Sequence, residues 1–123
     1  MLLPHQFPRP LRLSLYGLAV TVLLVLTNAP QKELPGVPVD DKLEHATAWF
    51  VLTALGYALS PRRTWAIPAF AVAFGGLVEI LQGVLPFGRD AEWGDLLADS
   101  SGVVVAVLAF ALARRLVRAR APA

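Results

Sequence analysis

The sequence contains no cysteine, which excludes disulfide bonds and metal sites made of thiolates. Charged residues are also scarce: they make up 16% of the 123 residues, whereas 56% are hydrophobic. A soluble domain of this length cannot bury that much apolar surface, because small domains leave a large share of their surface in water. The composition therefore indicates a membrane protein and argues against a soluble enzyme.

A strongly basic patch is missing as well, although the formal net charge is +2. The basic residues stand in pairs at the ends of apolar runs, where they act as signals for membrane topology. The sequence contains no P-loop, no nucleophile elbow and no zinc-finger spacing. We therefore expect no nucleic-acid partner.

The apolar residues fall into four runs, each close to the length that crosses a bilayer as a helix. We predict an all-α, polytopic membrane protein with four transmembrane helices. The predicted spans cover residues 11–27, 43–60, 64–85 and 95–113 of a transmembrane domain at 11–113. Pro68 is expected to kink the third span. Residues 1–10 are predicted to be a mobile N-terminal segment and 114–123 a basic cytoplasmic tail.

The first run has an alternative interpretation as a secretory signal peptide. Arg9 and Arg12 precede its apolar core, and residues 27–29 resemble a cleavage site. Three further apolar runs follow, which favours an uncleaved first span. We expect residues 1–29 to be retained.

The basic residues also predict the orientation. Eight of the eleven Lys and Arg lie near the termini or between the second and third spans, and cytoplasmic loops are the ones enriched in such residues. Both termini are therefore expected inside the cell (N-in, C-in). All nine acidic residues then fall on the outer side or in the outer half of a span, so the polar chemistry is one-sided.

Ionisable side chains in three of the spans lie at a similar depth. At ~1.5 Å per residue, His45, Glu79 and Asp99 lie roughly 6–9 Å inside the outer ends of their spans. Such groups are costly in a membrane unless they pair with one another or face a water-filled cavity, so we expect one shared pocket. The candidate pocket residues are Asp41, Lys42, His45, Glu79, Gln82, Arg89, Asp95 and Asp99.

Small residues would let these helices approach closely. Ala98, Gly102 and Ala106 recur at four-residue spacing in the fourth span, and Gly75 lies in the third. The polar residues could then form a structural clasp or a ligand pocket. A buried Glu79 must pair with Arg89 or Lys42, hydrogen-bond His45 or Gln82, or stay protonated. His45 is the only histidine there, so we expect no metal and no cofactor.

Taken together, the polar motifs resemble those of the VanZ family of small bacterial membrane proteins over roughly residues 38–110. The motifs are Asp41-Lys42-x-x-His45, Glu79-x-x-Gln82, Gly88-Arg89, and Asp95-Leu96-Leu97-Ala98 followed by Gly102. The family commonly has Asn where this chain has Asp99. The resemblance implies a multi-pass protein of the bacterial cytoplasmic (inner) membrane that is linked to the cell envelope. The family's namesake is associated with low-level teicoplanin resistance.

The resemblance implies no defined reaction, which favours a binding protein over an enzyme. Its partners would be membrane lipids and an envelope lipid, a lipid-linked cell-wall precursor or a glycopeptide. A first alternative is a membrane-embedded enzyme that acts on a lipid-linked phosphate. Arg89 and Lys42 would then hold the phosphate, and His45 with Glu79 or Asp99 would supply acid–base chemistry. A second alternative is a structural subunit of a membrane complex, with the small residues of the fourth span facing a partner.

Overall fold

The computed structural model describes residues 2–28, 41–86, 91–120 and 122. Their regular structure is entirely helical, which confirms the all-α prediction for these residues. A short 3-10 helix, η1 (Pro4–Gln6), precedes four α-helices. These are α1 (Arg9–Asn28), α2 (Asp41–Leu59), α3 (Ala66–Val84) and α4 (Trp93–Arg120).

The first three helices begin and end within two residues of the predicted spans, whereas α4 differs. It continues to Arg120, so most of the basic segment predicted as a tail belongs to the helix. Proline placement also differs from the expectation. Pro68 lies in the first turn of α3, where a missing N–H leaves no intrahelical bond unmade. The expected kink is therefore wrong, because only two residues of the helix precede this proline.

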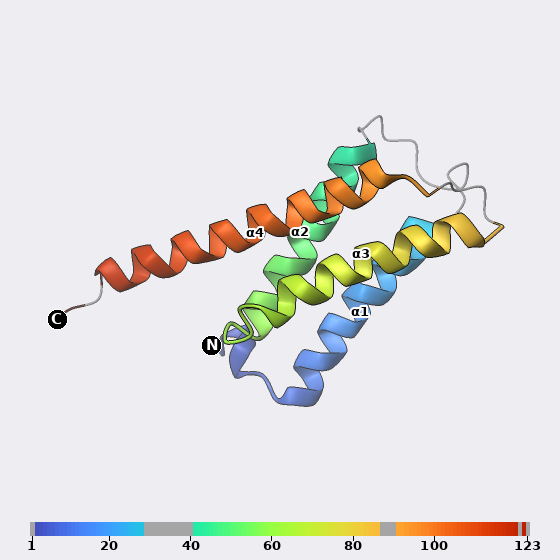
Figure 1. Ribbon diagram of the computed structural model, residues 1–123. Coiled ribbons are helices and arrows are strands. Elements are labelled where there is room, and N and C mark those ends of the chain that lie inside the picture. The colour runs from blue at the N-terminus through green and yellow to red at the C-terminus, as the bar shows by residue number, and fades with distance from the viewer. Residues whose placement is uncertain (1, 29–40, 87–90, 121, 123) are drawn as a thin grey trace.

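Helix α2 is central to the arrangement and packs against α1, α3 and α4 (Figure 1). It lies very close to α4 at Gly102. A Cβ atom at that position would lie only 2.1 Å from the carbonyl oxygen of Ala46, so only glycine fits. Ala106, one turn further along α4, is also buried, and Ala98 is half-buried. The small residues of α4 thus allow α4 to pack against other helices of the same chain.

The apolar core forms around Trp49, which is fully buried between α2 and α3. Its ring stacks on His45 at 5.9 Å and on Phe74 at 5.6 Å between centroids. Its Nε1–H donates a 2.8 Å hydrogen bond to the carbonyl oxygen of Ala71. The ring of Trp49 is therefore packed on its apolar faces and hydrogen-bonded at its N–H. It lies between the apolar core and the polar residues beyond His45.

Three helices, α1, α3 and α4, are long and apolar enough to cross a membrane. Large apolar side chains also stay exposed along them, such as Leu18, Ile80 and Leu108 at 61–65%. Soluble monomers rarely expose so much contiguous apolar surface, whereas a lipid environment accommodates it. The fold is therefore that of a membrane protein. The C-terminal half of α4 projects beyond the other helices (Figure 1).

Candidate functional site

Charged side chains gather at one end of the bundle, where α2 and α4 begin and α3 approaches its end. His45, Glu79, Asp95 and Asp99 are all at least nine-tenths buried there. We use the name polar cluster for Asp41, Lys42, His45, Glu79, Glu92, Asp95 and Asp99. Six of the eight residues proposed from the sequence belong to it. Gln82 lies elsewhere in the packing, and Arg89 lies outside the described residues.

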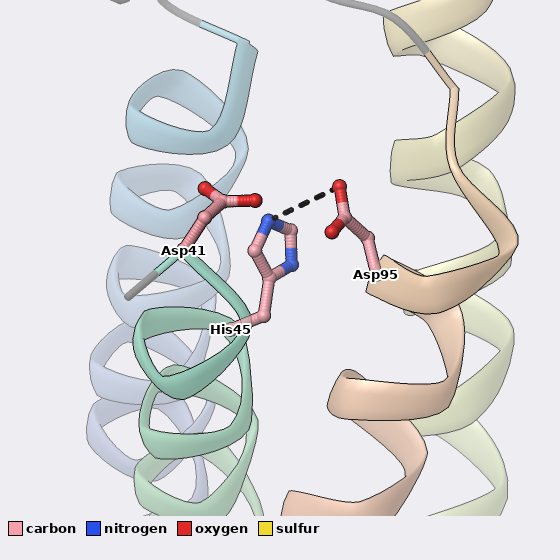
Figure 2. Close-up of side chains that lie close together, drawn as sticks. All are labelled: Asp41, His45 and Asp95. Atoms are coloured by element: carbon pink, nitrogen blue, oxygen red, sulfur yellow. Dashed lines mark ion pairs between the residues drawn. The ribbon is translucent and has the colours of Figure 1, made fainter. Parts of the chain in front are cut away.

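His45 is the centre of the polar cluster and has carboxylates on both sides of its ring. Its Nδ1 lies 2.7 Å from Oδ1 of Asp99, and its Nε2 lies 3.7 Å from Oδ2 of Asp95. Figure 2 shows the ring between Asp41, one turn earlier on α2, and Asp95 from α4. The short contact to Asp99 fixes the orientation of the imidazole, because it ties the ring to a fully buried carboxylate.

Lys42 links α2 to the start of α4. Its ammonium group hydrogen-bonds Asp95 and, at 2.5 Å, Glu92, and it lies 3.9 Å from Asp41. The hydrogen bonds to Asp95 and Glu92 raise the pKa of Lys42 above its ordinary value. This lysine lies just before the predicted second span and stays charged. It therefore offsets part of the negative charge of the cluster.

Glu79 enters the polar cluster from α3 and is held by the backbone of the connection between α3 and α4. Its Oε2 accepts a 2.9 Å hydrogen bond from the N–H of Glu92. Its Oε1 is buried and has no hydrogen-bond partner among the described residues. The sequence suggested Arg89, Lys42, His45 or Gln82 as partners. The partner found, a backbone N–H, could not be foreseen because it depends on the path of a loop.

Gln82 joins α3 to α1. Its Nε2 donates a 2.6 Å hydrogen bond to the carbonyl oxygen of Thr27, near the end of α1. Its side chain is 2% exposed, and its Oε1 has no partner in the described part of the chain. Gln82 therefore acts in helix packing, a role that its spacing three residues after Glu79 does not reveal.

A cleft of about 330 Å³ opens beside the polar cluster, between α3 and the start of α4. Its walls include Gly76, Ile80, Trp93 and Leu96, and the acidic residues Glu79 and Glu92 contribute to its lining. Ile80 and Trp93 are 65% and 83% exposed, so the apolar wall is open to the surroundings. Sequence reasoning missed Glu92, Ile80 and Trp93 as site residues. The acid-rich turn before α4 was the signal for Glu92.

A second cavity, of about 320 Å³, lies where α1 and α3 begin and α2 ends. Arg9, Arg12 and Arg63 line it together with Tyr16 and Phe70. Arg12 Nη1 donates hydrogen bonds to the carbonyl oxygen of Leu59 and to Oγ of Ser60. This end of the bundle is thus basic, whereas the end that carries the polar cluster is acidic.

No family model, curated protein or solved structure matches this chain. The resemblance to the VanZ family therefore stays a hypothesis that rests on the motifs alone.

Proposed function

We propose that this chain is a VanZ-like integral protein of the bacterial cytoplasmic membrane that binds an amphiphilic molecule of the cell envelope. The ligand would be an envelope lipid, a lipid-linked cell-wall precursor or a glycopeptide. The observation that carries the proposal is the cleft between α3 and α4, in which an exposed apolar wall meets two carboxylates. An amphiphile presents the matching pair of surfaces.

The apolar part of the ligand would lie against Ile80, Trp93 and Leu96. These side chains line the cleft from two helices, so a chain or ring placed between them loses water or lipid contact on both sides. The exposed indole of Trp93 suits the boundary between lipid and water, where aromatic residues gather.

The polar part of the ligand would meet Glu92, whose side chain is 57% exposed, with the buried Glu79 carboxylate behind it. Carboxylates accept hydrogen bonds and attract cations, so they select a group that carries N–H, O–H or ammonium donors. Amines, amides and sugar hydroxyls meet this condition. A phosphate alone does not, because its charge has the same sign as theirs.

The chemistry at Lys42 also favours binding over the phosphate-directed enzyme. That alternative needs a cation to hold the phosphate, and Lys42 is engaged by Asp95 and Glu92. Arg89 lies outside the described residues. The structural-subunit alternative needs the small residues of α4 to face a partner, whereas Gly102 and Ala106 are buried within the chain.

Four spans with both termini inside complete the proposal. Helix α2 is the one not apolar enough to qualify by itself, yet its contacts with all three other α-helices would shield it from lipid. The shared position of Arg9, Arg12 and Arg63 supports a single cytoplasmic end. A reporter fused after Ala123 should report the cytoplasm and one fused within residues 31–38 the outside. A cytoplasmic signal from the second fusion would reverse the assignment.

Ligand binding can be measured on the full chain in lipid nanodiscs, with a fluorescent lipid-linked cell-wall precursor and with teicoplanin as probes. We expect Trp93→Ala and Glu92→Gln each to weaken binding of the responding probe by about tenfold or more, equivalent to about 1.4 kcal/mol. Glu44→Gln and Leu18→Ala are the matched controls, because both residues are exposed and neither lines the cleft. Absence of binding to the wild type, or equal losses in the controls, would contradict the proposal.

A further inference from the structure

Three buried side chains from three different helices meet on the inner side of the polar cluster. They are His45 of α2, Glu79 of α3 and Asp99 of α4, with exposed fractions of 5%, 8% and 0%. One nitrogen or oxygen atom from each lies within 4.8 Å of the other two. Since ligands on opposite sides of an ion with bonds of ~2.1 Å are about 4.2 Å apart, only small side-chain adjustments separate this arrangement from a coordination shell.

The two carboxylates are each anchored by one oxygen and open at the other. Oε2 of Glu79 accepts a hydrogen bond from the N–H of Glu92, and Oδ1 of Asp99 contacts Nδ1 of His45. Oε1 of Glu79 and Oδ2 of Asp99 are buried with no hydrogen-bond partner among the described residues. Buried polar atoms are nearly always satisfied, so two unsatisfied carboxylate oxygens in one cluster call for a missing partner.

Glycine 75 leaves room beside one of these oxygens. A Cβ atom on Gly75 would lie 3.0 Å from Oδ2 of Asp99, closer than side chains normally pack. The absence of a side chain at this point of α3 therefore allows Asp99 to lie against α3 without a clash.

Charge identifies the kind of partner. Two carboxylates and a neutral imidazole carry a formal charge of −2, which is costly inside a bundle surrounded by apolar side chains. A divalent cation reduces that charge to zero and gives both open oxygens a partner. His45 would bind the ion as a neutral imidazole, through the ring nitrogen that carries no proton, so its single N–H would lie on the other ring nitrogen.

We propose that His45, Glu79 and Asp99 bind one divalent first-row transition metal ion, Zn²⁺ or Mn²⁺. One imidazole nitrogen with two carboxylate oxygens suits these ions better than Ca²⁺, which prefers six or more oxygen ligands. From the sequence alone we expected no metal because the cluster has a single histidine. Three protein ligands of which one is histidine are nevertheless enough for a site that keeps further positions open.

A second group of possible ligands, Asp41, His45 and Asp95, lies nearer the end of the bundle (Figure 2). There the ammonium of Lys42 already occupies Asp95, so an ion would compete with a fixed positive charge. Asp41 is also only half-buried. The inner group lacks both disadvantages, and the proposal concerns that group.

The test uses the full chain, purified with a tag free of histidine, stripped with EDTA and dialysed against ZnCl₂, MnCl₂ or CaCl₂. We expect about one Zn²⁺ or Mn²⁺ per chain by elemental analysis. Glu79→Gln and Asp99→Asn should each lower the affinity by about tenfold or more, because loss of even a supporting group beside a metal ligand lowers affinity by about 10–100-fold. Glu44→Gln should bind the ion with wild-type affinity, and Asp95→Asn should lose less affinity than Glu79→Gln or Asp99→Asn, because Asp95 is not a proposed ligand although it lies 3.7 Å from Nε2 of His45.

A spectroscopic measurement on a chain with all three ligands intact keeps the proposal testable if those variants fail to fold. The chain has two histidines, so His5→Ala leaves His45 as the only one. Pulsed EPR of Mn²⁺ bound to His5→Ala should show the nitrogen coupling of one imidazole. The proposal is wrong if neither transition metal binds, if only Ca²⁺ binds, if no imidazole coupling appears, or if Asp95→Asn alone abolishes binding.

Discussion

The two ends of the bundle carry opposite charge and satisfy it in different ways. At the basic end, Arg12 donates hydrogen bonds to the carbonyl oxygens of Leu59 and Phe7. A cation at the C-terminus of a helix such as α2 also interacts favourably with the helix dipole. The position of this arginine is therefore explained by structure alone.

The acidic end contains more charge than structure requires. Asp41 and Asp95 lie in the first turns of α2 and α4, where the helix dipole favours a carboxylate. Glu79 lies instead in the C-terminal half of α3, where the dipole gives it no stabilisation. Asp99 lies beyond the first turn of α4 and is fully buried. Helix stability therefore does not explain the positions of Glu79 and Asp99, which is the reason to assign function to this end.

Removal of Arg12 should have the larger effect on stability. In Arg12→Leu, the carbonyl oxygen of Leu59 and the hydroxyl of Ser60 lose a charged donor, so the end of α2 frays from α1. Hydrogen bonds to charged groups contribute ~1.5–3 kcal/mol, and since Arg12 is half-exposed we expect a loss of about 1–2 kcal/mol. Thermal unfolding in detergent measures it.

Arg9→Leu is the matched control for this prediction, because Arg9 lines the same cavity but is exposed. We expect its melting temperature to stay close to that of the wild type. Equal losses in the two variants would show that the total charge of the cavity matters and that the specific bonds of Arg12 do not.

The sequence predicts the helices well because their apolar runs are bounded by clear signals. Charged residues and prolines separate the first three runs, and α1, α2 and α3 agree with the predicted spans to within two residues. The end of α4 could not be predicted from hydropathy. Residues 114–120 include four arginines, but the Arg, Ala and Leu among them all favour a helix, so the helix continues after the apolar run ends.

The candidate site, like the fold, could be predicted from the sequence only in part. Helical spacing and depth placed His45, Glu79 and Asp99 at one level, and the structure brings their side chains together. Contacts that depend on loops or on which helices are neighbours could not be derived. Glu92 reaches Glu79 through a backbone N–H, and Gln82 reaches Thr27 only because α1 lies beside α3. Periodicity within one helix contains neither kind of information.

Neutralising Glu79 should have a smaller effect than removing Arg12, and an effect of the opposite sign. In Glu79→Gln, the amide oxygen can still accept the hydrogen bond from the N–H of Glu92, while the negative charge is removed. Replacement of buried charges by neutral groups is often neutral or stabilising, so we expect the metal-free protein to gain up to about 1 kcal/mol. Thermal unfolding after EDTA treatment measures this gain.

The same variant with Zn²⁺ added completes the comparison between the two ends. A ligand that binds only the folded state raises its melting temperature, so Zn²⁺ should stabilise the wild type and leave Glu79→Gln unchanged. The order of stability would then reverse between the metal-free and metal-loaded samples, as expected where stability is given up for function. A loss of stability in metal-free Glu79→Gln comparable to that of Arg12→Leu would instead make Glu79 a structural residue. In that case the two ends of the bundle would differ only in the sign of their charge.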